Sequence, residues 1–420
     1  MREDQLHYIW KNRLFSKLVL NGTPVEVLAL GEHNHTDGPD FIGAKLRWDS
    51  ITWVGMVELH LKSSDWYAHN HHRDSRYDAV ILHIVLEGDS PVRDSSGRII
   101  PTARLSVDKD ILDTLNKLTL SRESLRCAPE ISLLSEPVVH SLLESLLIER
   151  WESKVYKLTL QGESDYAHQL FYRLLLRYLG ALRNNDVMEQ VAQSLPYTIL
   201  RKHADNRIAL EAMLLGQAGI IQETPRDDYE AQLLREYSFY RQKFDLRPIA
   251  PGQFRKLRVR PATHPSRMLG IAATLLHHPD ELMDALLSLS LERMSTILSL
   301  PPSDYWCRHF DFARESSRRL GGVGKETLTS LIINAALPTL YLYLRHIGKE
   351  SEANRTIELL RSLPPENNHI TQLFASIGIT AKDAAESQAL LHLYRNYCTP
   401  YRCLSCPVAP KIFQHLSEHD

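Results

Sequence analysis

The stretch that decides the fold is residues 38–66, GPDFIGAKLRWDSITWVGMVELHLKSSDW. It holds two runs rich in apolar, aromatic and β-branched residues, 41–48 and 51–62, separated by the Asp-Ser pair at 49–50. Such runs favour strands, and a two-residue polar link between them is typical of a tight turn. The stretch therefore predicts a β-hairpin.

The hairpin predicts a cluster of polar side chains at its open end. With the turn near residue 50, antiparallel pairing puts Asp40 opposite positions near 60. Side chains alternate along a strand, so Glu58, His60 and Lys62 share one face. We therefore expect Asp40, Glu58 and His60 to lie close together.

The flanking sequence completes a predicted α/β domain. Residues 3–14 have the apolar spacing of one amphipathic helix, and 18–30 read as two short strands around an Asn-Gly turn. Residues 77–88, YDAVILHIVLEG, are apolar enough for a strand buried on both faces. Another strand pair surrounds 93–98, and 108–119 has helical period.

Helical patterns dominate the rest of the chain. After about residue 130 the apolar residues recur at helical spacing, as in 138–158, VVHSLLESLLIERWESKVYKL. No fixed-period repeat and no low-complexity segment is present. The sequence therefore predicts an α+β protein, with an α/β domain at 1–120 and an all-helical domain at 121–420 that ends in a cysteine-rich tail.

The bulk composition is that of an ordinary globular protein. The 420 residues are 43% hydrophobic and 24% charged, with a formal net charge of −2. No global basic field marks a nucleic-acid-binding protein, so such binding would need a local basic surface. No apolar run approaches 18 residues and the first residues carry no export signal, so we expect a cytoplasmic protein with no membrane span. Oligomeric state is not predicted.

Two carboxylates at one end of a hairpin predict a cation between them. Asp40 and Glu58 would repel each other unless an ion or a shared proton compensates. Mg²⁺ or Mn²⁺ is a natural compensator, and such an ion can activate water and polarise a phosphodiester. The purely structural alternative is that Asp40 caps a turn and Glu58 pairs across the strands with Lys45 or Arg47.

The same residues resemble the PD-(D/E)xK nuclease superfamily, whose fold is restriction-endonuclease-like. GPDF at the start of one strand and VELH on the next match its Pro-Asp and acid-x-Lys positions. The resemblance implies that Asp40 and Glu58 hold the metal and that Glu3, on the preceding helix, completes the site. His60 occupies the lysine position, and Lys62, two residues on, is the expected substitute. It implies hydrolysis of DNA or RNA.

The whole chain also resembles an uncharacterised bacterial family known only as domain of unknown function 2851. The matching features are GPDF, VELH, SSDW, the histidine-rich HNHHRD at 69–74 and the cysteine-rich tail. This resemblance implies no activity.

Histidines follow the hairpin closely. If residues 69–72 are extended, His69 and His71 point to one side and could bind Zn²⁺, Mn²⁺ or Fe²⁺ together with a nearby aspartate. They could equally belong to a solvated loop. His83 lies in the apolar strand, where a core histidine bonded to a backbone carbonyl is the expected reading.

Four cysteines predict a second metal site. Cys398, Cys403 and Cys406 give C-x4-C-x2-C, and Cys127 in LRCAPEI is the expected fourth ligand. Cys307, flanked by aromatics, reads as core packing. Zn²⁺ and a [4Fe–4S] cluster both remain open. Some nucleases of the superfamily hold such a cluster on one plus three cysteines, although there the lone cysteine precedes the nuclease motifs.

A basic stretch predicts a phosphate-binding surface. Residues 254–267, FRKLRVRPATHPSR, contain five cations and no acid, and Arg258 and Arg260 share a side if extended. A solvated face is the alternative. Taken together, the sequence predicts a metal-dependent nuclease. The rival hypotheses are a catalytically silent nucleic-acid-binding or scaffold protein with a structural Zn or Fe–S site, and a hydrolase of small substrates centred on the histidines.

Overall fold

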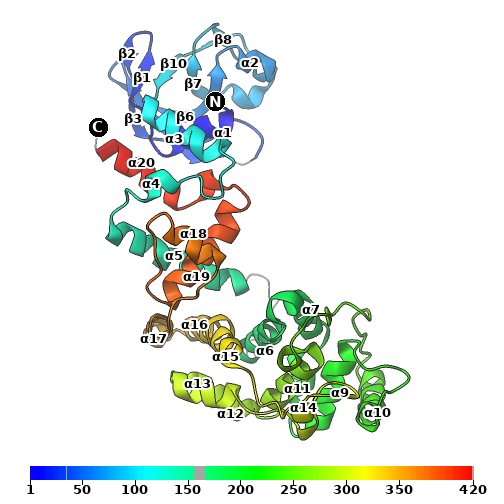
Figure 1. Cartoon of the computed structure of the whole chain (residues 1–420). Coiled ribbons are helices and arrows are strands. Elements are labelled where there is room, and N and C mark those ends of the chain that lie inside the picture. The colour runs from blue at the N-terminus through cyan, green and yellow to red at the C-terminus, as the bar shows by residue number, and fades with distance from the viewer. Residues whose placement is uncertain (35, 156–165, 419–420) are drawn as a thin grey trace. The chain divides into compact units, whose positions relative to one another are not determined.

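The computed structural model describes residues 1–34, 36–155 and 166–418. The chain divides into two units. Unit 1 contains Met1–Leu143, Asn368–Thr380 and Leu390–Asp420, and unit 2 contains Glu144–Asn367 and Ala381–Ala389. The mixed α+β class is confirmed, with the large sheet at the N-terminal end and helices after it (Figure 1).

Unit 1 is built on an eight-stranded mixed sheet. The strands are β1 (Lys17–Leu20), β2 (Thr23–Pro24), β3 (Glu26–Ala29), β4 (Glu32–His33), β5 (Phe41–Trp48), β6 (Ile51–Lys62), β7 (Val80–Glu87) and β10 (Thr102–Ser106). Their order is β2-β1-β10-β7-β6-β5-β3, with β4 also paired to β5. The pairs β6–β7 and β7–β10 are parallel and the others antiparallel.

The predicted hairpin is β5–β6, the pair that positions the site. Its register runs from Trp48 opposite Ile51 back to Phe41 opposite Val57. The turn residues Asp49 and Ser50 both have positive φ, 49° and 64°, as a two-residue hairpin turn requires.

Alternation along β6 separates core from site. Val57 and Leu59 enter the main core of unit 1 together with helices α1 (Glu3–Lys11) and α3 (Lys109–Leu120). Glu58 and His60 therefore face the other side of the sheet. That side carries a smaller apolar cluster around Trp66.

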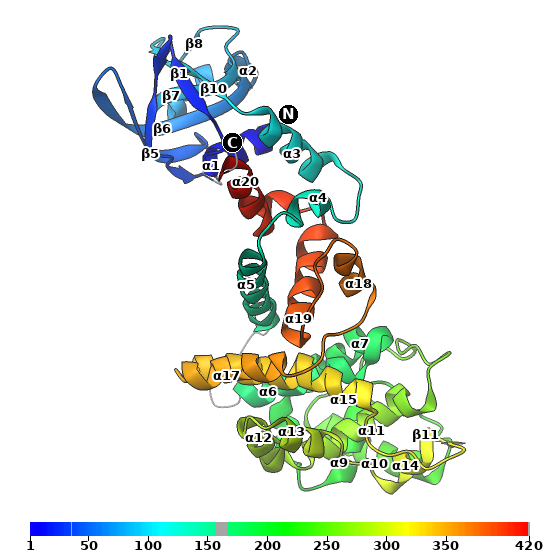
Figure 2. The ribbon, with the colours of Figure 1, turned by 60° about the vertical axis from the view of Figure 1, so that its left-hand side comes forward.

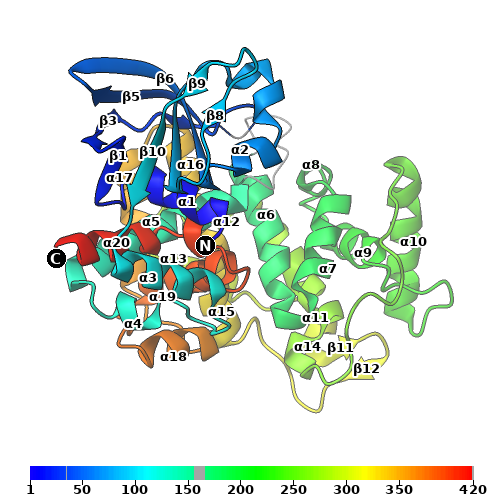
Figure 3. The same cartoon turned by 90° about the horizontal axis from the view of Figure 1, so that it is seen from above.

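The crossover from β6 to β7 covers the site's face. It contains α2 (Asp65–Ala68) and two single turns, His71–Arg73 and Ser75–Tyr77. Figure 3 shows α2 beside the short strands β8 (Val92–Arg93) and β9 (Ile99–Ile100), and the Trp66 indole donates to the Arg93 carbonyl at 2.9 Å. The segment 69–72 is therefore wound rather than extended, which corrects the sequence-based expectation: Asn70 sits in the left-handed region at φ 62°.

The C-terminal segment belongs to unit 1. Ala409 and Phe413 of α20 (Val408–Glu418) lie in the same core as α1 and the sheet, and α20 lies beside α3 and α4 (Ala128–Ile131) in Figure 2. The predicted limits, 1–120 and 121–420, therefore differ from the two units. The apolar face of a helix 400 residues away could not be assigned to the sheet from its spacing alone.

The remaining elements are nearly all helical. They are α5 (Glu136–Val155), α6 (Tyr166–Leu179), α7 (Ala181–Ser194), α8 (Tyr197–Arg201), α9 (Arg207–Gln217), α10 (Asp228–Lys243), α11 (Pro265–Leu276), α12 (Pro279–Leu287), α13 (Leu291–Leu298), α14 (Asp304–Arg308), α15 (Lys325–Leu331), α16 (Leu337–His346), α17 (Glu350–Arg361), α18 (His369–Ala375) and α19 (Ala384–Leu393). Unit 2 also has a two-stranded sheet, β11 (His309–Asp311) and β12 (Arg314–Glu315), so the helical part is not purely helical.

One helical stretch of unit 2 is long and apolar enough to cross a membrane, Lys325–His346. Core helices of soluble proteins can be equally long and apolar. Here 72% of its most apolar window is buried inside the protein, as in such a core helix.

Candidate metal centres

The hairpin brings Asp40 and Glu58 into direct contact. The Asp40 backbone N–H donates to Glu58 Oε2 at 2.9 Å, and the Leu59 N–H donates to Asp40 Oδ2 at 2.9 Å. Glu58 is 4% exposed, whereas Asp40 is only partly buried. The predicted juxtaposition of these two carboxylates is therefore present, at the end of β5 and β6.

Imidazoles surround the inner carboxylate. Glu58 Oε1 lies 3.2 Å from His71 Nε2 and 3.6 Å from His60 Nε2. His60 Nε2 lies 3.1 Å from His69 Nδ1, and one nitrogen from each of the three histidines lies within 4.8 Å of the others. Donor atoms bound to one ion at about 2.0–2.2 Å are roughly 3.3 Å apart in a tetrahedral site, so these separations suit a bound metal.

His83 contacts His60, one of the three clustered histidines, through the ring nitrogen that does not face Glu58. Its Nε2 lies 2.8 Å from His60 Nδ1, and both rings are fully buried. The expectation that His83 bonds a backbone carbonyl is wrong, because the parallel β6–β7 register places Glu58 beside His83 and brings the two rings together. A proton held on His60 Nδ1 would leave His60 Nε2 free to bind a metal, which is the usual arrangement of a metal-binding histidine.

Burial makes the charges of this cluster unusual. Desolvation and the neighbouring Asp40 raise the pKa of Glu58 to about 9. Desolvation and the other histidines lower the pKa of His60 to about 2, and desolvation lowers the pKa of His83 to about 3. The pKa of His71 is also lowered, chiefly by burial. At neutral pH these imidazoles are neutral, which is the form that binds metals.

Helix α1 adds a histidine that sequence reasoning missed. His7 Nε2 lies 3.1 Å from Asp40 Oδ2. Burial lowers the pKa of His7, but the contact with Asp40 and the charges of Glu3 and Glu58 outweigh it and raise the pKa. Glu3, the predicted helix acid, is thus near the site, although none of its described contacts joins it to Asp40 or Glu58. The one local signal is that His7 follows Glu3 by four residues, on the same face of the helix, but its contact with Asp40 depends on how the helix packs.

Lys62 does not join the cluster. Its ammonium pairs with Glu87 Oε2 at 3.4 Å, and its side chain is 54% exposed. Lys62 is the last residue of β6, and the register of the parallel pair places it opposite Glu87 of β7. The expected substitute for the superfamily's lysine therefore lies outside the site, and His60 alone occupies the predicted position.

Aromatic rings pack the back of the cluster. Tyr77 stacks on His71 with ring centroids 3.8 Å apart, and Trp66 meets the edge of His71 at 5.4 Å. Desolvation raises the pKa of Tyr77 to about 12, so its hydroxyl stays protonated. These contacts fix His71 in place although it lies on a single helical turn. The exposed His69 leaves one side open to solvent.

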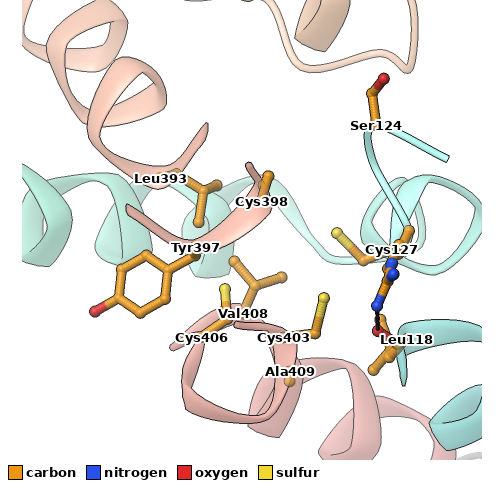
Figure 4. Close-up of a pocket in the computed structure, with 11 residues that line it drawn as sticks. Leu118, Ser124, Cys127, Leu393, Tyr397, Cys398, Cys403, Cys406, Val408 and Ala409 are labelled. Atoms are coloured by element: carbon orange, nitrogen blue, oxygen red, sulfur yellow. Dashed lines mark hydrogen bonds between the residues drawn. The ribbon is translucent and has the colours of Figure 1, made fainter. Parts of the chain in front are cut away.

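The predicted cysteines gather at a second place in unit 1. Cys127, Cys398, Cys403 and Cys406 line one cavity, and none of the four forms a disulfide (Figure 4). Desolvation, together with the neighbouring thiols, raises the pKa of Cys127 to about 12 and raises the pKa of Cys398 as well. Cys307 is buried in unit 2, as expected of a packing residue.

The basic stretch lies in unit 2. Arg258 and Arg260 are exposed, and Arg258 has a positive φ of 57°. A cavity of about 910 Å³ is lined instead by their neighbours Arg255 and Lys256 and by Arg183 of α7, and neither predicted arginine lines it. Arg183 and Lys256 were not distinguished in sequence because a cavity depends on tertiary packing.

Comparison with known proteins identifies a family without an assigned activity. No curated protein and no solved structure matches the chain. The family model described as "Protein of unknown function (DUF2851)" matches residues 3–369. This range includes the histidine–carboxylate cluster and Cys127, and it ends before the three C-terminal cysteines. The chain belongs to this family, DUF2851.

Proposed function

We propose that this protein is a metal-dependent phosphodiesterase that hydrolyses DNA or RNA, with its centre at Asp40, Glu58 and the adjoining histidines. One observation carries the proposal. Glu58 is buried against Asp40, and among the described ion pairs these two carboxylates meet only histidines, never lysine or arginine. Buried charge of this kind needs a proton or a metal ion to compensate it.

The donor set favours a transition metal. Of the two ions expected from sequence, Mn²⁺ suits the cluster better than Mg²⁺, because imidazole nitrogens are ligands of transition metals whereas Mg²⁺ takes oxygen ligands. His60, His71 and Glu58 would hold the ion, with Asp40 and His69 completing the set on the exposed side. Bound there, a divalent ion would lower the pKa of a water ligand and polarise a phosphoryl oxygen.

The chain's own residues supply orientation and a proton. His83 holds the His60 ring, and Tyr77 holds the His71 ring. The contact with Asp40 raises the pKa of His7 and so favours the protonated form of its imidazole. Its Nε2 is the atom from which a proton can pass to the leaving oxygen.

The arrangement of elements supports the resemblance to PD-(D/E)xK nucleases. A helix precedes a hairpin that carries the two acids, and a crossover leads from β6 to the parallel strand β7. The departure is at the lysine position, which His60 occupies. In this proposal a metal-bound imidazole takes the place of the lysine, and the exposed cations Arg258 and Arg260 contact the phosphate backbone.

The test is cleavage of single- and double-stranded DNA and RNA with Mn²⁺, comparing the native protein with Asp40→Asn and Glu58→Gln. The matched control is Glu26→Gln, which changes an exposed carboxylate on the same sheet that pairs with Arg47. Cleavage by the native protein and the control, lost in both site variants, would support the proposal. No cleavage by folded protein loaded with Mn²⁺ would contradict it.

One observation favours the rival function. Lys62 pairs with Glu87, and among the described ion pairs no lysine contacts Asp40 or Glu58, as in a site that binds without cleaving. A nucleic-acid-binding protein of this kind would lose affinity in Arg258→Ala and would be indifferent to Glu58→Gln. Binding titrations with both variants separate this outcome from a nuclease with an untested substrate.

A further inference from the structure

We propose that Cys127, Cys398, Cys403 and Cys406 bind an iron–sulfur cluster of the [4Fe–4S] type, a second metal centre independent of the histidine–carboxylate cluster. Four thiols from distant parts of the chain line one cavity, and this convergence needs a reason. Thiolate ligands select zinc or iron–sulfur clusters among biological metals.

Three separate segments deliver the four cysteines. Cys127 immediately precedes α4, Cys398 ends a turn of π-helix at Tyr394–Cys398, and Cys403 and Cys406 bracket the single turn Cys403–Ser405. Figure 4 shows the four side chains around one space. The cavity there is about 20 Å³, and its other walls are mainly apolar, including Leu118, Leu393 and Val408.

The backbone around the C-terminal cysteines is wound into a tight knuckle. The Arg402 N–H donates to the Tyr397 carbonyl at 2.8 Å, and the Cys406 N–H donates to the Cys403 carbonyl at 3.1 Å. Tyr401 adopts a left-handed conformation at φ 57°, which a tyrosine rarely does. Tyr401 lies between Cys398 and Cys403, and both of these cysteines line the same cavity.

The separation of the sulfur atoms favours a cluster over a single ion. Four thiolates on one Zn²⁺ at about 2.3 Å are roughly 3.8 Å apart. Within the described residues, no three of these cysteine sulfurs lie within 4.8 Å of one another. The iron atoms of a polynuclear cluster stand away from its centre, so its cysteine ligands are spread more widely than those of one ion.

A cation stands beside the thiols. Arg126 lines the same cavity, its guanidinium lies 4.0 Å from the Tyr401 ring centroid, and its Nη1 donates to the carbonyls of Leu118 and Thr119. Four thiolates around a cluster leave a net negative charge, which a fixed guanidinium offsets. The arginine is thus positioned by backbone groups rather than by an acidic partner among its described contacts.

The site would tie the C-terminal segment to the rest of unit 1. Cys127 follows α3, and Cys406 leads directly into α20, whose Phe413 lies in the core of the sheet. The four donors are all thiols, and none of them is suited to proton transfer between substrate atoms. A structural role therefore fits the arrangement.

The test begins with the native full-length protein purified without oxygen. Iron, acid-labile sulfide and zinc are measured per chain, before and after reconstitution with ferrous iron and sulfide, and absorbance is recorded near the wavelengths of iron–sulfur charge transfer. The expected result is about four iron and about four sulfide per chain. One zinc without iron, or reconstituted protein that retains no iron, would overturn the proposal.

Variants then assign the ligands. Cys127→Ser and Cys403→Ser are expected to lose most of the iron and sulfide, whereas Cys307→Ser, which alters a buried thiol of unit 2, is expected to keep both. Full cluster content in both ligand variants would exclude this ligand set. Because metal analysis of the native protein needs no variant, the proposal remains testable if a serine variant fails to fold.

Discussion

The two clusters of unit 1 differ in how the chain assembles them and in what they offer a metal. The histidine–carboxylate cluster comes from residues 7 to 83 and mixes imidazoles with two acids at a partly exposed edge. The cysteine cluster joins residue 127 to residues near 400 and offers only thiols in a small cavity with mainly apolar walls. Mixed, partly open donor sets suit reaction, and uniform, closed ones suit structure. Unit 1 thus contains two candidate metal sites of different kinds, one with mixed donors and one with thiols alone.

The largest effect on stability is expected at the cysteines. Cys403→Ser should lower the free energy of unfolding of metal-loaded protein by roughly 3–5 kcal/mol, because the bound metal closes a loop of more than 250 residues. Thermal unfolding of Cys403→Ser and of Cys307→Ser measures it. An equal change in the two variants would mean that the cysteine cluster binds no metal.

The next effect is expected in Mn²⁺ affinity. His60→Ala and His71→Ala each remove a ligand of the proposed centre, and each should weaken Mn²⁺ binding by roughly 100-fold. His72→Ala is the control, since its ring contacts Tyr67 in a tilted arrangement and lies outside the three-histidine group. Calorimetric titration gives the affinities. Similar values for all three variants would show that His60 and His71 are not ligands of Mn²⁺.

A smaller effect is expected behind the ligands. His83 touches no expected ion and acts by orienting His60 through their 2.8 Å contact. His83→Ala should therefore weaken Mn²⁺ binding by about 10-fold while leaving stoichiometry unchanged. An unchanged affinity would show that the His60 ring is held by packing alone.

A further effect is expected in the pH dependence of the stability of the metal-free protein. Glu58 has its pKa raised to about 9 by burial and Asp40, so between pH 6.5 and 9 the folded state binds more protons than the unfolded state, and stability falls as pH rises. His60 and His83 act with the opposite sign below pH 6.5, because burial lowers their pKa values to about 2 and 3. Urea unfolding across this range should show a maximum near pH 6.5. In Glu58→Gln the decline above it should weaken; an identical decline would assign it to another group.

Local features of unit 1, such as the β5–β6 hairpin, could be predicted from the sequence, whereas contacts between distant elements could not. The Asp-Ser turn and the alternation of β6 fixed the hairpin register, so the contact of Asp40 with Glu58 could be predicted. His7 and His83 were missed as site residues because their approach depends on how α1 and β7 pack onto the hairpin. The position of α20 in the core of unit 1 has no local signal, and the unit limits followed from it.

Anomalous diffraction from crystals soaked in Mn²⁺ would show whether the histidine–carboxylate cluster binds a metal. We expect a manganese peak within bonding distance, about 2.0–2.3 Å, of Glu58 Oε1 and His60 Nε2, with His71 beside it. A map with no peak there at saturating Mn²⁺, and with Glu58 still in contact with His71, would contradict it.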